Sequence, residues 1–187
     1  MIPFPDKKYQ IIYADPPWSF KNYNNDKSNS NASHHYKCMQ IEEIKKLPVS
    51  EIANDNCILF MWCTDPLLDK QIQVIEAWGF KYKTVGFYWL KQNKDSSLWM
   101  GTGYWTRANP EICLIATKGK PKRISGNVRK VVYSKRGKHS KKPDEVRDRI
   151  VKLMGDLPRI ELFARPPKDL LLEDESYKGW DVWGNEI

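Results

Sequence analysis

The chain has 187 residues, 41% of them hydrophobic, which suits one domain with a sizeable core and excludes a disordered tail. No apolar run is long enough to span a bilayer, and the N-terminus lacks the layout of a signal peptide, so we expect a cytoplasmic protein without a membrane partner. The net charge of +8 favours a polyanionic partner.

The first predicted strand is the apolar run Tyr9–Ala14, which ends at Asp15, Pro16, Pro17 and Trp18. Residues before proline avoid the helical region, and proline lacks an N–H donor, so these residues should form a stiff corner at the end of the strand. A carboxylate, a prolyl carbonyl and an aromatic ring held there suit a flat substrate with an exocyclic amine, such as adenine. The alternative is a Pro-rich turn with a buried tryptophan.

Helices and strands alternate along the rest of the chain. A polar loop at 21–38 comes first and is predicted to act as a gate over the corner. We expect helices at 40–47, 66–78 (with Asp65 as cap) and 143–154, and further strands at 57–62, 83–91, 111–117, 131–133, 159–163 and 180–183. This alternation predicts an α/β fold with a mostly parallel sheet and helices on both faces, in a single domain covering residues 1–187.

The cysteines form no C-x-x-C pair, and the three histidines show no metal-binding spacing, so no metal site is expected. Three of the cysteines lie in or beside apolar runs and are predicted to be buried thiols: Cys57, Cys63 and Cys113.

Basic residues concentrate between positions 118 and 142, which hold eleven Lys or Arg and no acid, leaving 20 cations against 23 anions elsewhere. One such segment favours a nucleic-acid partner, whereas a solvated charged loop is the alternative. The predicted contacts with the nucleic-acid backbone are Lys120, Lys122, Arg123, Arg129, Lys130, Lys135, Arg136 and Lys138.

Several motifs, in order, resemble the adenine-N6 methyltransferase family typified by the catalytic subunit of the eukaryotic mRNA methyltransferase, in its bacterial or phage form. The resemblance runs from about residue 9 to residue 187. The matching segments are Asp15-Pro16-Pro17-Trp18, His35-Tyr36, 59–62, 88–91, 111–121, 139–145, 161–165 and 184–186.

The resemblance implies a Rossmann-like methyltransferase fold with permuted motif order and S-adenosylmethionine as cofactor. It also implies the residues that would hold this methyl donor, which are Asp15, Lys142, Leu162, Phe163, Ala164, Arg165, Asn185 and Glu186. The chain before Asp15 is shorter than in eukaryotic members, so Pro3 and Phe4 are expected to cover the adenine end of the donor.

The catalytic residues implied are Asp15, Pro16, Pro17 and Trp18, and the pocket for the base would be formed by Trp18, Tyr36, Trp62, Trp89 and Lys91. Asp15 and the Pro16 carbonyl would accept the amine hydrogens, while Trp18 would stack on the base. DNA is favoured over RNA because no additional target-recognition domain is present, an argument by analogy. The alternatives are an RNA adenine-N6 methyltransferase, a non-catalytic nucleic-acid-binding subunit and a plain RNA-binding protein; a homodimer or a heterodimer is open.

Overall fold

The computed structural model describes residues 3–19, 38–101, 103, 105–137, 141–164 and 177–184. The predicted gate loop, apart from Cys38, lies outside the described residues. So do five of the predicted site residues: Tyr36, Lys138, Arg165, Asn185 and Glu186.

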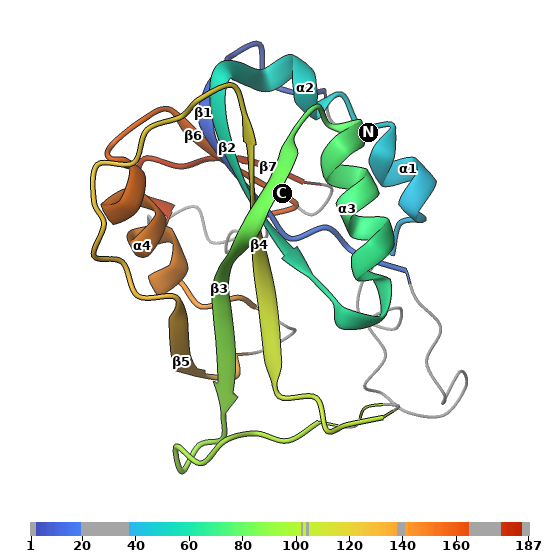
Figure 1. The fold of residues 1–187 in the computed structure, drawn as a ribbon, viewed down its shortest axis with the longest axis vertical. Helices are drawn as coiled ribbons and strands as arrows, with labels where there is room; N and C mark the ends of the chain where they lie inside the picture. Colours follow the sequence, from blue (N-terminus) through green and yellow to red (C-terminus); the bar gives the residue numbers. More distant parts are fainter. Residues whose placement is uncertain are drawn as a thin grey trace, which may run out of the picture.

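A seven-stranded sheet forms the centre of the molecule, in the order β5-β3-β4-β2-β1-β6-β7 (Figure 1). The strands are β1 (Tyr9–Ala14), β2 (Ala53–Cys63), β3 (Lys81–Gln92), β4 (Pro110–Lys118), β5 (Val131–Lys135), β6 (Arg159–Leu162) and β7 (Asp181–Trp183). Strand β4 is antiparallel to both of its neighbours, whereas the other four pairings are parallel. The predicted mostly parallel sheet is therefore confirmed.

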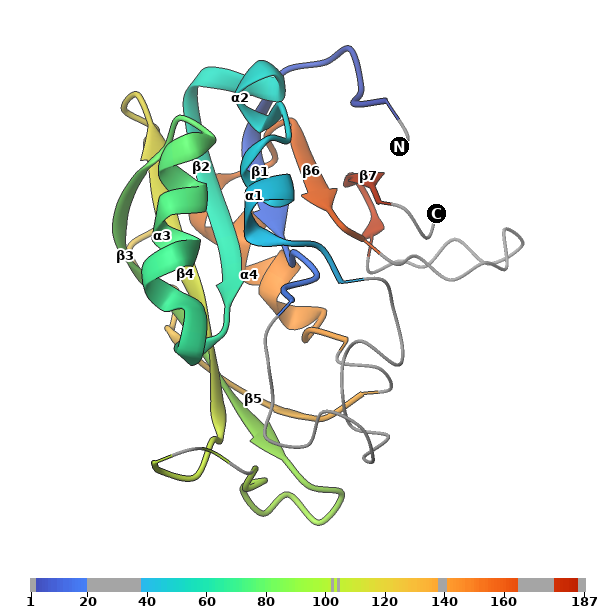
Figure 2. The same ribbon diagram turned by 90° about the vertical axis from the view of Figure 1, so that its right-hand side faces the viewer.

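Helices cover both faces of the sheet, as predicted. They are α1 (Ile41–Lys45), α2 (Val49–Ile52), α3 (Leu68–Ala77) and α4 (Glu145–Met154). Helices α1 and α3 lie side by side on one face, and α4 lies on the other (Figure 2). The permuted motif order stays a prediction. None of the described helices is long and apolar enough to cross a membrane.

Strand β2 shows how the sequence produces this layering. Its apolar run is continuous, so alternate side chains enter two different cores. Cys57, Leu59 and Met61 pack with α1, α2 and α3, whereas Phe60 and Trp62 pack with α4. The predicted burial of the three cysteine thiols is confirmed, and burial raises the pKa of Cys57 to about 12.

Two predicted helix starts are wrong. Asp65 does not cap α3 but begins a 3₁₀ turn, η2 (Asp65–Leu67), and the α-helix follows it. The buried amide of Gln71 instead accepts the N–H of Thr64 at 3.1 Å and donates to its Oγ1 at 3.1 Å. Helix α4 begins two residues after Pro143, and ends as predicted at Gly155, whose φ of 93° suits glycine.

All strands except β4 end at the same edge of the sheet, which we call the site edge. Strand β4 runs the other way, so it begins at the site edge and ends at the opposite one. The chain then returns along the outside of α4 to form β5 (Figure 1). Arg149 of α4 fastens this return, because its guanidinium donates to the carbonyls of Arg129 and Val131 at 2.7 Å each.

A buried ion pair joins α4 to β6. Arg147 and Glu161 are 4% and 6% exposed, and their side chains meet at 2.5 Å and 3.2 Å. The Arg147 guanidinium also lies 4.0 Å from the ring of Tyr177. Removing one partner would leave the other charge buried without compensation.

We expect Arg147→Met to lower the free energy of unfolding by about 3–5 kcal/mol, because the Glu161 carboxylate stays buried alone. The double variant Arg147→Met/Glu161→Leu should recover most of this loss. Urea unfolding measures both, with the exposed Arg123→Ala as the control. A single variant within 1 kcal/mol of the wild type, roughly the value of an exposed pair, would contradict the assignment.

Candidate active site

The end of β1 forms a corner that is fixed on both sides. The Asp15 N–H donates to the carbonyl of Leu162 on β6 at 3.4 Å. The Met39 N–H donates to the Pro17 carbonyl at 2.9 Å, and the Trp18 N–H donates back to the Pro16 carbonyl at 2.8 Å. The Asp15 side chain is 30% exposed, so the carboxylate at this corner is open to solvent.

Trp18 fastens this corner to the core. Its ring is 5% exposed and packs on the face covered by α1 and α3. Its indole N–H donates to the carbonyl of Trp62 at 3.0 Å. The structure thus gives Trp18 a packing role, while its stacking on a substrate base stays a prediction.

Four charged side chains from four segments form a continuous chain of ion pairs at the site edge. Lys142 Nζ lies 2.8 Å from Asp15 Oδ2 and 3.3 Å from Glu111 Oε2. The other oxygen of Glu111 lies 2.5 Å from Lys91 Nζ. The side chains of Lys142, Glu111 and Lys91 are between 12% and 19% exposed, so water screens these contacts weakly.

The pKa shifts of Lys142 and Glu111 show how strongly their partners favour the charged forms. Burial alone would lower the pKa of Lys142, but the carboxylates of Asp15 and Glu111 outweigh burial and raise it. Burial alone would raise the pKa of Glu111, but Lys142 and Lys91 outweigh it and lower that pKa. Both shifts favour the charged forms, an ammonium group at Lys142 and a carboxylate at Glu111.

Glu111 is absent from the predicted site residues, although it is the centre of this cluster. It is the second residue of the apolar strand β4. In a parallel strand that position would lie at the opposite edge, but β4 is antiparallel and brings it to the site edge. The signal in the sequence is a lone acid at the start of an otherwise apolar run.

The predicted pocket tryptophans lie directly beneath the ion pairs. Trp62 and Trp89 are each 1% exposed and meet edge to face at 6.4 Å. Their N–H groups donate to the Tyr13 hydroxyl at 2.6 Å and the Ser134 carbonyl at 3.3 Å. Lys142 lies 5.6 Å from the centre of the Trp62 ring, and the predicted pocket residue Lys91 lies 5.3 Å from that of Trp89. The two tryptophan rings thus form the buried floor on which the ion pairs lie.

The ends of β6 and β7 close against each other next to Asp15. The N–H groups of Phe163 and Ala164 both donate to the Trp183 carbonyl, at 2.6 Å and 3.2 Å. Phe163 has a φ of 63°, unusual for a bulky residue and a mark of functional turns. A Cβ on Gly184 would lie 2.9 Å from the Ala164 carbonyl oxygen, so the turns approach too closely for a side chain.

This arrangement fits the methyl donor that the motifs imply. The predicted segment Leu162–Ala164 lies beside Asp15, and Lys142 and Asp15 offer opposite charges to a zwitterionic sulfonium. Phe4 stacks on Trp183 with ring centres 4.2 Å apart, which brings the N-terminal residues to the same turns.

The predicted backbone contacts do not lie together. Lys120 donates its N–H to Asn56 at the start of β2, and Ile124 donates to Leu153 near the end of α4, so Lys120, Lys122 and Arg123 lie at the edge opposite the site. Lys135 and Arg136 lie at the site edge, where the Arg136 N–H donates to the Gln92 carbonyl at 3.2 Å. Arg129 and Lys130 lie along the return between them, and all seven are exposed.

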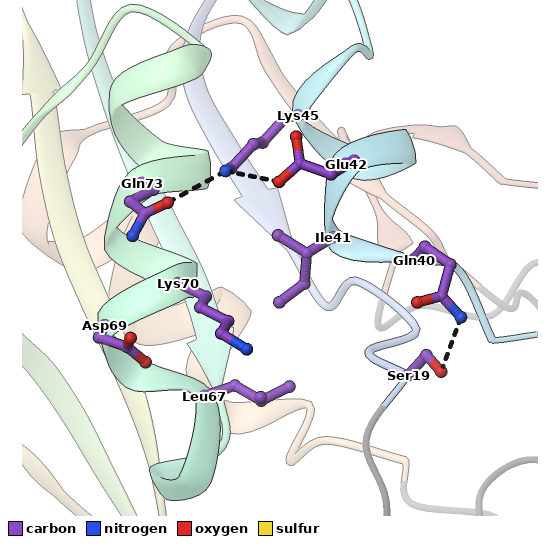
Figure 3. Close-up of a pocket in the computed structure, with 9 residues that line it drawn as sticks. All are labelled: Ser19, Gln40, Ile41, Glu42, Lys45, Leu67, Asp69, Lys70 and Gln73. Carbon is purple, nitrogen blue, oxygen red and sulfur yellow. Dashed lines mark hydrogen bonds and ion pairs between the residues drawn. The ribbon is translucent and has the colours of Figure 1, made fainter.

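A hollow of about 360 Å³ lies between α1 and α3 (Figure 3). Ser19, just after the corner, lines it and accepts a hydrogen bond from Gln40 at 3.3 Å. Lys45 of α1 donates to Glu42 on the same helix and to Gln73 on α3. Neither Asp15 nor Lys142 lines this hollow, so we place the site at the ion pairs and not here.

The chain is similar in sequence to known proteins over almost its whole length. The MT-A70 family model matches residues 9–186. The chain is 38% identical to the type II methyltransferase M.MunI of Mycoplasma sp, over 98% of this chain and 79% of that protein. It is 26% identical to the human N(6)-adenosine-methyltransferase catalytic subunit METTL3 and to an Arabidopsis thaliana MT-A70-like N(6)-adenosine-methyltransferase, over 96% of this chain but only 28% and 24% of theirs.

The family resemblance predicted from the motifs is thus confirmed over nearly the same range. A family model covering most of the chain and a relative at 38% identity leave one conclusion: the chain belongs to the MT-A70 family.

Proposed function

We propose that this chain transfers a methyl group from S-adenosylmethionine to the N6 amine of adenine in DNA. The observation that carries the proposal is Asp15, held at the end of β1 by Lys142 and partly open to solvent. The family supports the reaction class. The type II methyltransferase of Mycoplasma sp is matched over 79% of its length, whereas human METTL3 is matched over only 28% of its length. This difference in coverage supports DNA over RNA as the substrate.

The chemistry asks for hydrogen-bond acceptors aimed at a weakly nucleophilic amine. The lone pair of adenine's amine is conjugated with the ring, so two acceptors that hold its hydrogens help to localise that pair on nitrogen. The Asp15 side chain, paired with Lys142, supplies the first acceptor. The Pro16 carbonyl already accepts the Trp18 N–H, but a carbonyl has two lone pairs and can supply the second. The bound donor supplies an electrophilic methyl group.

The ion-pair cluster has the role of orienting Asp15. Lys142 remains protonated and Glu111 remains ionised, so neither is suited to move a proton during the reaction. Lys142 is shared between two carboxylates, one of which, Asp15, is hydrogen-bonded through its N–H to Leu162. It can therefore orient Asp15 and still offer charge to the donor's carboxylate, together with Arg165. Asn185 and Glu186 would hold the ribose.

The remaining assignments follow the sequence predictions. Residues 1–187 act as one methyltransferase domain, with 21–38 as a gate. Lys135 and Arg136 are the basic residues best placed to meet the phosphates around the target base, because they lie at the same edge of the sheet as Asp15.

Asp15→Asn keeps the size of the side chain but removes its charge. We expect methyl transfer to fall by at least about 100-fold, as for the loss of one strong transition-state contact. Donor binding, measured by isothermal titration, should change by only a few-fold. The control is Asp69→Asn, an exposed acid on α3.

The assay incubates each protein with isotopically labelled donor and duplex DNA, single-stranded DNA or RNA, followed by nucleoside analysis. The proposal fails if Asp15→Asn turns over normally or if the methylated product is not N6-methyladenine. A larger yield on RNA than on DNA would overturn the choice of nucleic acid alone.

Glu111→Gln tests the charge cluster through pH. The folded pKa of Glu111 is below its ordinary value of 4.5, so the folded state binds this proton less readily and its stabilisation is present above pH 4.5. At pH 7 the variant should lose about 2–3 kcal/mol of unfolding free energy. The difference from wild type should shrink as pH falls below 4.5. A difference that is constant from pH 7 to pH 3, or no larger than that of the exposed control Glu76→Gln, would contradict the cluster.

Two double variants test which basic residues meet the nucleic acid. Lys135→Ala/Arg136→Ala, at the site edge, should weaken binding of labelled duplex DNA and reduce the slope of log K against log salt by about 2, one for each lost phosphate contact. Lys122→Ala/Arg123→Ala, at the opposite edge, should leave affinity and slope unchanged. Fluorescence anisotropy across a salt series measures both. Equal losses in the two variants would show that the whole basic segment binds.

A further inference from the structure

The connection between β3 and β4, residues 93–109, carries apolar side chains into solvent. Trp105 is 98% exposed, Met100 is 68% exposed and Leu98 is 56% exposed. Six of the other seven tryptophans are at most 8% exposed, so Trp105 differs from almost every other tryptophan of the chain. An aromatic ring that stays fully in water contributes no hydrophobic free energy to folding.

This exposure is not that of a loose segment, because the connection has a built stem. The Trp99 N–H donates to the Lys91 carbonyl at 2.8 Å, and the Gly101 N–H donates to the Ala108 carbonyl at 2.7 Å. The Asn109 amide donates to the Trp99 carbonyl from the other side. A Cβ at Gly101 would clash with the Trp99 ring and the Ala108 carbonyl, so glycine is required where the two sides meet. Trp105 is thus held outward on the loop above this stem.

The stem stands on the ion-pair cluster. It leaves β3 after Lys91 and enters β4 just before Glu111, the two residues that meet at 2.5 Å. The connection therefore rises from the site edge beside the place where Asp15 lies. Figures 1 and 2 both show it at the end of β3, on the side away from α2.

The connection that carries Trp105 is basic. The Trp99 ring at the stem contacts two cations, with Lys91 Nζ 5.0 Å and the Arg136 guanidinium 4.6 Å from its centre. Lys94 and Arg107 are exposed on the same connection. The acid between them, Asp95, is occupied, since its carboxylate accepts both the N–H and the hydroxyl of Ser97 at 3.0 Å and 2.6 Å.

Exposed aromatic and apolar groups on the same connection as exposed cations match one kind of ligand. A nucleic-acid strand offers phosphates to the cations and flat base faces to an indole, and such stacking is tolerant of sequence. An apolar protein surface would cover Trp105 and Met100 but would bury Arg107 and Lys94 without partners.

We propose that Trp105 is a base-stacking site: its indole packs on an unpaired base of the bound strand, outside the pocket for the target adenine. The inference rests on the proposed function for the identity of that strand as substrate. Arg136 and Arg107 would meet the phosphates beside the stacked base. Because the ring is already exposed, no rearrangement of the stem is needed.

The test compares Trp105→Ala and Trp105→Phe with a control, Ile124→Ala, an apolar residue that is 72% exposed at the opposite edge. Each protein binds two labelled single-stranded DNAs of equal length and charge, one with normal bases and one with abasic residues at its centre. We expect Trp105→Ala to weaken binding of the normal strand by about ten-fold and Trp105→Phe to retain most of the affinity. Neither change should affect the abasic strand, and the control should affect neither. Circular dichroism verifies that each variant is folded.

An equal loss on both strands, or no loss on either, overturns the proposal. A shift of Trp105→Ala to a smaller species in sedimentation, without a base-dependent loss, also overturns it and makes this connection a protein interface. The outcomes are separable from those of the proposed function. If the wild type does not methylate DNA but Trp105→Ala still weakens binding of the normal strand alone, the stacking site stands and the methyltransferase assignment fails. If the wild type methylates DNA but Trp105→Ala causes no base-dependent loss, the methyltransferase assignment stands and the stacking site fails.

Discussion

The ammonium group of Lys142, shared by the carboxylates of Asp15 and Glu111, is the constraint on which the site depends. It joins the end of β1, the start of β4 and the segment that precedes α4. Lys142, Glu111 and Lys91 are largely buried, and taking their charges out of water costs free energy that close pairing must offset. The pairing with Lys142 favours one orientation of the Asp15 carboxylate, and Glu111 holds Lys142 in place from its other side.

The local elements could be predicted from the sequence, because their signals are local. Strand β1 matches its predicted bounds, and the continuous apolar run of β2 correctly indicated burial on both faces. The 3₁₀ turn before α3 could not be predicted, because the Gln71 amide that bonds Thr64 lies seven residues further along the chain. A contact supplied from within a helix leaves no pattern at the helix start.

The site was predictable only in part, and the direction of β4 explains why. Side-chain period reveals a strand but not which way it runs, so Glu111 could not be assigned to the same edge as Asp15. The same reversal divides the basic residues, which are continuous in sequence but lie at both ends of the sheet. The tryptophans show a different limit. Composition cannot distinguish a ring that packs, such as Trp18, from one that stays in water, such as Trp105.

The fastening of the return to β5 by Arg149 has a consequence for how copies of the protein meet. Strand β5 is the last strand on its side of the sheet, and such a strand can template aggregation through its free carbonyls. Here the Arg129 and Val131 carbonyls are already occupied, and Lys130, Lys135 and Arg136 add positive charge at the two ends of the strand. The positive charges of two such edge strands repel one another, whereas the negatively charged phosphates of a nucleic acid are attracted to them. The charges proposed to recruit the substrate thus also discourage sheet-to-sheet self-association.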